Sequence, residues 1–167
     1  MIILTDLTEL RRMAHARQKE NKEFFRRLKR KKYPELDQVV HSLHEKAFSL
    51  IDCLKCANCC KTISPVIRET DIRRMAQKLR MKPSELSTQY LETDQDLDYV
   101  FRVQPCPFLL PDHYCSVYES RPIACREYPH TDRRRFSQIL DISLKNVAIC
   151  PAVYAIVEEM KQDQRLQ

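Results

Sequence analysis

Apolar residues recur at helical spacing over several stretches of the chain. In the clearest case, apolar positions follow Pro34 at intervals of three or four residues as far as Ile51. Because an α-helix turns once every 3.6 residues, this spacing gathers the apolar side chains on one face and predicts an amphipathic helix. The same pattern predicts helices at residues 72–79, directly after Pro83, and at residues 146–162. The chain is therefore expected to be mainly α-helical.

The other segments give weaker signals. Residues 5–31 predict a polar helix whose thin apolar stripe is interrupted, which indicates either a break or a projecting helix. A short strand is predicted at residues 99–103 and an extended piece at 63–67, where Pro65 limits pairing. Residues 104–130 contain five prolines and three cysteines. We expect irregular structure there, organised by ligands rather than by regular backbone hydrogen bonds.

These elements predict a small helical domain, with irregular cysteine-rich loops and at most short strands around a metal site. The chain has 167 residues, enough for a hydrophobic core, and it has no glycine. Turns with positive φ must then use other residues, which disfavours tight hairpins. We expect an N-terminal helical extension with a basic run at residues 1–45 and a cysteine-cluster domain at residues 46–167.

The eight cysteines point to metal chemistry. The N-terminus lacks the basic start and long apolar run of a secretory signal, and no segment approaches the roughly 20 apolar residues that span a bilayer. A cytoplasmic location, without membrane insertion, is therefore expected. Thiols stay reduced in the cytoplasm, so the cysteines predict metal or redox chemistry rather than disulfides.

The first cysteine cluster contains four thiols within eight residues, at Cys53, Cys56, Cys59 and Cys60. Thiolates are soft donors that bind zinc and iron strongly, and the two-residue gaps let a turn direct two sulfurs at one ion. Cys59 and Cys60 are adjacent, and neighbouring side chains point apart in most backbone conformations. We expect them to serve two sites, or one of them to be a spare thiol.

Four further cysteines are candidate ligands with weaker individual signals. Cys106, Cys115 and Cys125 are too far apart for a short knuckle and would have to be brought together by the fold. Cys150 begins an apolar helix, and it fits a ligand and a small core residue equally well. Weaker candidates for metal contacts near the second group are His113, Glu119, Glu127 and His130, and two arginines there could offset thiolate charge, Arg121 and Arg126.

The spacing leaves the metal open. Cys-x2-Cys-x2-Cys matches the start of a ferredoxin-type iron–sulfur run, whose fourth ligand often precedes proline, as Cys106 and Cys150 do. No second Cys-x2-Cys pair exists, which slightly favours iron–sulfur over structural zinc. Eight cysteines also divide into two four-thiolate zinc sites. Zinc, iron and an iron–sulfur cluster all remain candidate cofactors.

Taken together, these motifs resemble a known family. The run from Cys53 to Cys60, then Cys106, and the segment from Cys115 to Arg126 resemble the YkgJ-type cysteine cluster proteins, also called the CxxCxxCC family. The resemblance covers roughly residues 50–155. It implies chelation of zinc or iron by the cysteines of the first cluster and by Cys106, Cys115 and Cys125. A flagellin lysine N-methylase carries a related domain, and by analogy this makes protein modification a candidate activity.

Family members often have glycine after the second cysteine, where this chain has Ala57. A knuckle with positive φ at that position would be strained in this chain.

The net charge of +6 is partly concentrated in a basic run at residues 26–32. No recognition motif or interleaved aromatic residue accompanies the run, so we interpret it as a solvated helix end and do not expect nucleic acid as a partner. The expected partners are a metal ion and a protein partner or protein substrate.

The leading hypothesis is a metal-binding protein with a structural or accessory role. The alternative is an iron–sulfur-dependent enzyme, or enzyme subunit, that modifies a protein or peptide. The sequence leaves open whether the protein is an enzyme.

Overall fold

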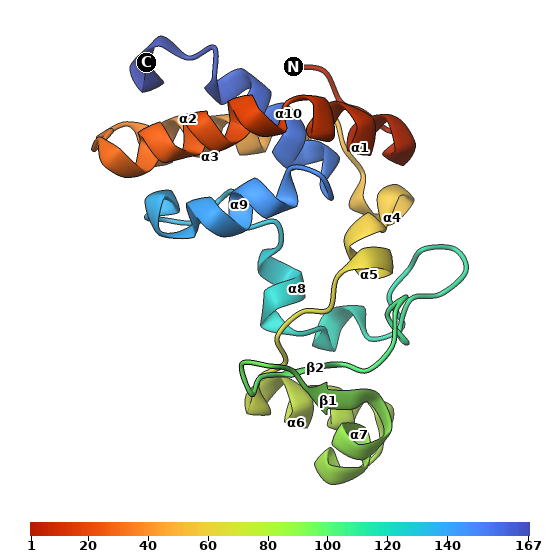
Figure 1. The fold of residues 1–167 in the computed structure, drawn as a ribbon. Coiled ribbons are helices and arrows are strands. Elements are labelled where there is room, and N and C mark those ends of the chain that lie inside the picture. The colour runs from red at the N-terminus through yellow and green to blue at the C-terminus, as the bar shows by residue number, and fades with distance from the viewer. The chain divides into compact units, whose positions relative to one another are not determined.

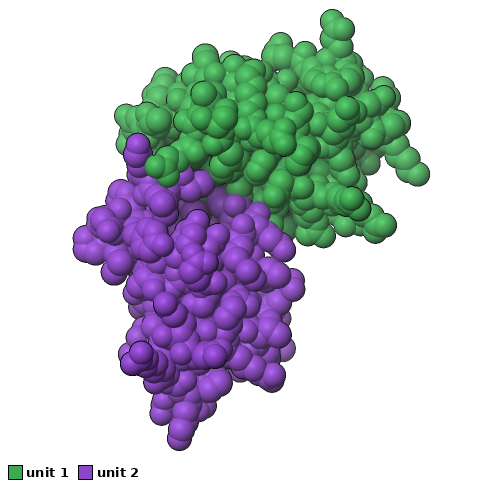
Figure 2. Space-filling view, turned by 180° about the vertical axis from the view of Figure 1, so that it is seen from behind, with its two compact units in different colours: residues 1–52, 129–167 green, residues 53–128 purple.

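The computed structural model describes residues 1–167 and confirms a mainly helical fold (Figure 1). The chain forms two compact units, shown in Figure 2. Unit 1 comprises residues 1–52 and 129–167, and unit 2 comprises residues 53–128. Residues 1–45 thus belong to the same unit as the C-terminal helices. The division at residues 45 and 46, made from the family pattern, stays a prediction about domain boundaries.

Unit 1 is a group of helices around one core. Its main helices are α1 (Leu7–Ala16), α2 (Gln18–Arg30), α3 (Leu36–Phe48), α9 (Leu140–Asn146) and α10 (Pro151–Met160), and its short 3-10 helices are η2 (Phe136–Ile139) and η3 (Gln164–Leu166). Helix α10 lies against α1 and α3, while α9 lies against α2 (Figure 1). Eight of the ten residues of α10 are buried, so this helix is apolar on every side.

In unit 1, the observed helices differ in their bounds from two of the predicted ones. The predicted helix at residues 5–31 is broken at Arg17, whose ψ of 3° leaves the helical region. It does not project, because Leu10, Phe24 and Phe25 are buried in the core. The predicted helix at residues 146–162 was wrong at its start, since α9 ends at Asn146 and α10 begins at Pro151. Proline disfavours helical backbone in the residue before it, which explains this interruption.

Unit 2 contains the first seven candidate cysteines. Its helices are α4 (Cys53–Cys56), α5 (Asn58–Thr62), α6 (Glu69–Leu79), α7 (Pro83–Tyr90), the 3-10 helix η1 (Tyr118–Ser120) and α8 (Ile123–Glu127). Strands β1 (Leu91–Thr93) and β2 (Tyr99–Phe101) pair antiparallel, with Leu91 opposite Phe101. The apolar faces of α6 and α7 pack on this ribbon and form a separate core that includes Met75, Leu86 and Phe108.

The predicted extended segment before α6 is present and is tied to the ribbon. Ile67 donates its backbone N–H to the Tyr99 carbonyl at 2.7 Å, and the Ser64 hydroxyl accepts the Phe101 N–H at the same distance.

No helix in the chain combines the length and apolarity that crossing a membrane demands.

Candidate metal centre

The first cysteine cluster folds as two short helices that meet at Ala57. Helix α4 carries Cys53 and Cys56, and α5 carries Cys59 and Cys60. Between them Ala57 adopts the left-handed conformation, with φ 48° and ψ 18°, and donates its N–H to the Cys53 carbonyl at 2.9 Å. A left-handed residue with a Cβ costs roughly 1–2 kcal/mol. The knuckle therefore uses the positive φ that glycine would adopt freely, and alanine adopts it here under strain.

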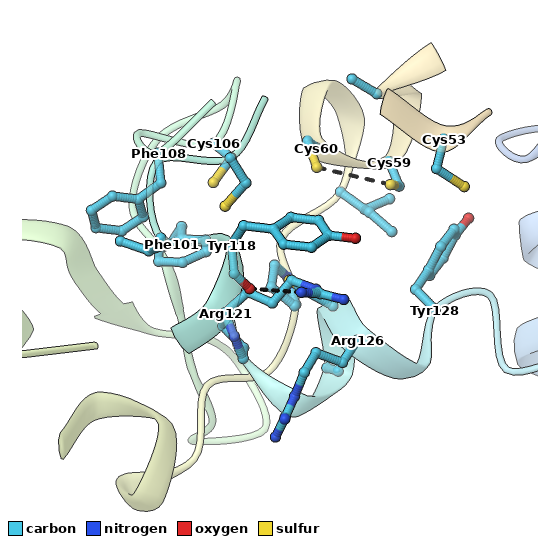
Figure 3. Close-up of a pocket in the computed structure, with 18 of the residues that line it drawn as sticks. Cys53, Cys59, Cys60, Phe101, Cys106, Phe108, Tyr118, Arg121, Arg126 and Tyr128 are labelled. Atoms are coloured by element: carbon cyan, nitrogen blue, oxygen red, sulfur yellow. Dashed lines mark hydrogen bonds between the residues drawn. The ribbon is translucent and has the colours of Figure 1, made fainter. Parts of the chain in front are cut away.

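Cys59 and Cys60 lie on the same side of this knuckle. Their Sγ atoms are 4.0 Å apart, and both residues line one cavity (Figure 3). Two sulfurs on one tetrahedral zinc ion, each about 2.3 Å from the metal, are separated by about 3.8 Å. The pair is therefore close to the separation that a shared ion requires, although adjacent side chains were expected to point apart.

Backbone contacts bring the second group of cysteines to the first. The Cys106 N–H donates to the Cys60 carbonyl at 2.9 Å, which joins the two segments directly. The chain then turns back on itself, and an isolated β-bridge pairs Leu109 with Cys115. Cys125 is supplied by the short helix α8. All three cysteines of this group line the same cavity as Cys60, and their role as remote ligands stays a prediction.

The thiols of this group influence one another electrostatically. A hydrogen bond from the Cys59 thiol, helped by the charge of Lys61, lowers the pKa of Cys60 to about 7. Burial, together with the Cys60 charge, raises the pKa of Cys106 to about 11 and that of Cys125 to about 12. Burial and the same charge also raise the pKa of Cys115. One thiolate thus disfavours the next, and a bound cation would reverse that repulsion.

The cavity has a volume of about 270 Å³ and is lined by six of the eight candidate cysteines: Cys53, Cys59, Cys60, Cys106, Cys115 and Cys125. Cys56 is not among its lining residues. Cys150 belongs to unit 1, where it precedes α10 and packs against that unit's apolar core.

The soft thiol donors fit zinc or iron. Their side chains nevertheless surround the cavity without converging, and no group of three or more Cys, His, Asp or Glu is positioned to hold an ion.

Aromatic and basic side chains form the wall opposite the first cluster. In Figure 3, Tyr118, Arg121 and Tyr128 face Cys53, Cys59 and Cys60 across the cavity. The Arg121 guanidinium stacks on the Tyr118 ring, 3.8 Å from its centre, and donates to the Tyr118 carbonyl at 2.6 Å. Its charge lowers the pKa values of Cys115 and Cys125, against the larger effect of burial. Arg121 therefore has the charge-balancing position expected for it.

His113 is engaged as a structural link. Its Nε2 lies 2.9 Å from the Lys61 ammonium, which can only donate, and its Nδ1 lies 3.2 Å from the Lys55 carbonyl, which can only accept. These contacts join the loop before Cys115 to the first cluster.

The other weak candidates do not line the cavity. Glu119 and Glu127 are exposed, and His130 belongs to unit 1. Arg126 does line it, although Figure 3 shows its side chain extending away from the cysteines.

Sequence reasoning missed a buried ion pair that supports this wall. Asp71, only 1% exposed, contacts Arg74 at 2.5 Å and accepts the N–H groups of Arg68 and Ile123, both at 3.1 Å. Arg74 also donates to the carbonyl of Arg121 at 2.8 Å. The pair therefore attaches α6 to the segment that carries Arg121 and Cys125. The available signal was a carboxylate on the apolar face of a predicted helix.

A sequence model of the CxxCxxCC family, described as a putative zinc- or iron-chelating domain, matches residues 52–150. The chain belongs to this family. The match covers more than half of the chain and includes all eight cysteines. No curated protein and no solved structure matches the chain. The family establishes a cysteine domain of the zinc- or iron-chelating class, and the resemblance inferred from the motifs is confirmed.

Proposed function

We propose that unit 2 binds zinc or iron through thiolates around its cavity, with Cys60, Cys106, Cys115 and Cys125 at the centre of the site. The observation that carries this proposal is that these four thiols line one cavity, where the Cys106 N–H is bonded to the Cys60 carbonyl. In agreement with this proximity, the Cys60 charge raises the pKa values of the other three thiols. Clustered thiols in a half-buried cavity bind a soft cation strongly, because thiolate sulfurs are soft donors. The metal supplies a cross-link between the two cysteine segments, in a structural or accessory role.

Cys53, Cys56 and Cys59 are further ligand candidates, since the family pattern includes them. Cys53 and Cys59 line the cavity, whereas Cys56 would have to approach it by a rearrangement of α4. We rank Cys150 last, because it packs against the core of unit 1.

The test is to purify the protein without oxygen and measure zinc, iron and acid-labile sulfide per chain. We expect Cys60→Ser and Cys125→Ser to lose most of the bound metal, because serine is a poor ligand for these ions. Cys150→Ser is the matched control and should retain it. Full metal content in both cavity variants would remove this assignment, and loss of metal only in Cys150→Ser would reverse the ranking.

A second candidate function is an iron–sulfur-dependent modification of a protein or peptide. The cavity volume supports it, because about 270 Å³ is several times the roughly 30 Å³ that one water molecule occupies. The cavity thus has room for a small ligand or side chain beside a metal. Iron with a matching amount of acid-labile sulfide would favour this candidate, and zinc without sulfide would exclude it.

A further inference from the structure

A positively charged surface lies in unit 1, whereas the cysteine cavity belongs to unit 2. Unit 1 contains 18 lysines and arginines against 13 aspartates and glutamates, whereas unit 2 contains 11 against 10. Most of the excess positive charge of the chain is therefore located in unit 1. Charge of this kind attracts polyanions if it is exposed and not neutralised within the protein.

The fold joins two basic runs that are a hundred residues apart in the sequence. The first ends α2, and the second is Arg133-Arg134-Arg135 before η2. Asp37, in the first turn of α3, accepts the backbone N–H groups of Arg135 at 2.6 Å and Phe136 at 2.9 Å. Lys29 pairs with Asp141 of α9 at 2.5 Å. These contacts hold both runs at one end of unit 1 (Figure 1).

Part of the first run is neutralised, and the remainder is not. Arg26 pairs with Glu23 and Lys29 with Asp141, as expected for a solvated helix end. Five side chains are exposed and make no ion pair or side-chain hydrogen bond in this structure, and we call them the basic surface: Arg30, Lys32, Arg133, Arg134 and Arg135.

Asp37, in the helix that follows the first run, uses both carboxylate oxygens to accept backbone N–H groups and forms no ion pair with these side chains.

We propose that the basic surface binds the phosphodiester backbone of a nucleic acid. Guanidinium groups form paired hydrogen bonds with phosphate oxygens, and four of the five side chains are arginines. Leu28 within the first run is buried, and Ile142, beside Asp141, is the one large exposed apolar side chain in the helices that contact the first run. A protein interface or a membrane-docking face would be expected to include several such side chains. No nucleic-acid partner was expected from the sequence, because no recognition motif or interleaved aromatic residue accompanies the first run and the expectation did not take the second run into account.

The test uses the full chain and fluorescent 20-nucleotide single strands of RNA and DNA of the same sequence. The variant Arg30→Gln/Lys32→Gln/Arg133→Gln/Arg134→Gln removes four charges and leaves the backbone contacts of Asp37 intact. The control Lys19→Gln/Lys22→Gln/Arg73→Gln/Lys78→Gln removes four exposed charges elsewhere. Melting curves establish that both variants are folded.

We expect at least about tenfold weaker binding in the first variant and less than about threefold in the control, since phosphate contacts dominate such affinity. The slope of log K against log salt should fall by about 3, at roughly 0.7 per lost phosphate contact. Similar binding of both strands indicates phosphate recognition alone, and a preference for RNA adds recognition of the 2′-hydroxyl.

Equal losses in the two variants would overturn the proposal. So would a wild-type protein that binds neither strand. Tighter binding of poly-glutamate or of anionic lipid vesicles would also overturn it, by indicating an acidic protein or a membrane instead.

Discussion

Replacing Asp71 with alanine should destabilise the wall of the cavity that carries Cys125. The substitution leaves the N–H groups of Arg68 and Ile123 without their acceptor and breaks the pair with Arg74. All three contacts are hydrogen bonds to a charged carboxylate, and such bonds contribute about 1.5–3 kcal/mol each. The Arg74 side chain is 31% exposed and keeps its contacts to the carbonyls of Ser120 and Arg121, so its charge is not stranded. We therefore expect a loss of about 3–5 kcal/mol, the range for broken buried pairs.

The assay is urea unfolding of the metal-loaded protein, combined with metal content per chain. Asp6→Ala is a matched control, because the Asp6 carboxylate also accepts two backbone N–H groups, but at the exposed start of α1 in unit 1. It should cost about 1 kcal/mol and retain the metal. A double-mutant cycle with Arg74→Ala isolates the ion pair. If Asp71→Ala costs less than about 1 kcal/mol and keeps its metal, the positioning role of Asp71 is wrong.

Two further predictions concern backbone strain and pH. Arg80 is exposed and follows the end of α6 with a φ of 55°, which is strained for a residue with a Cβ. Arg80→Gly should therefore raise the free energy of unfolding by about 0.5–1 kcal/mol, because the relief of strain exceeds the added freedom of the unfolded chain. A lower melting temperature of the variant would contradict this prediction. Burial lowers the pKa of His44, with the charge of His41 adding to the effect and those of Asp132 and Glu45 opposing it. The folded protein therefore favours the neutral ring, and stability should be full above the unfolded pKa of about 6.5 and fall as the pH drops below it. His44→Gln should flatten this dependence in urea titrations between pH 7.5 and 5, and an identical slope in the two proteins would refute the assignment.

Much of the helical structure could be predicted from local patterns. Helix α3 and helix α6 follow from apolar periodicity, and α7 follows from Pro83, which occupies its first turn. Periodicity indicates which face of a helix is buried but not which partner covers it. The packing of residues 1–45 with the C-terminal helices was therefore not predictable, and α9 was missed because it is only seven residues long.

The candidate site could be predicted in part for a similar reason. Cysteine count and spacing indicated candidate ligands, and six of the eight line one cavity. The separation of Cys150 depends on the contacts of α10, and the proximity of Cys59 and Cys60 depends on the conformation of these two residues within α5. Neither can be read from ligand spacing alone. The role of Asp71 depends on contacts with residues some fifty positions away, which no local pattern reports.

The division of the chain also sets an order of events during synthesis. Unit 2 is one continuous stretch, whereas unit 1 is made from the two segments that flank it. Because synthesis runs from the N-terminus, all the residues of unit 2 emerge from the ribosome before the helices that complete unit 1. The apolar faces of helices α1 to α3 remain uncovered until α10 has emerged. The cysteine unit can therefore fold during synthesis, while the first three helices expose apolar surface that favours aggregation until unit 1 is complete.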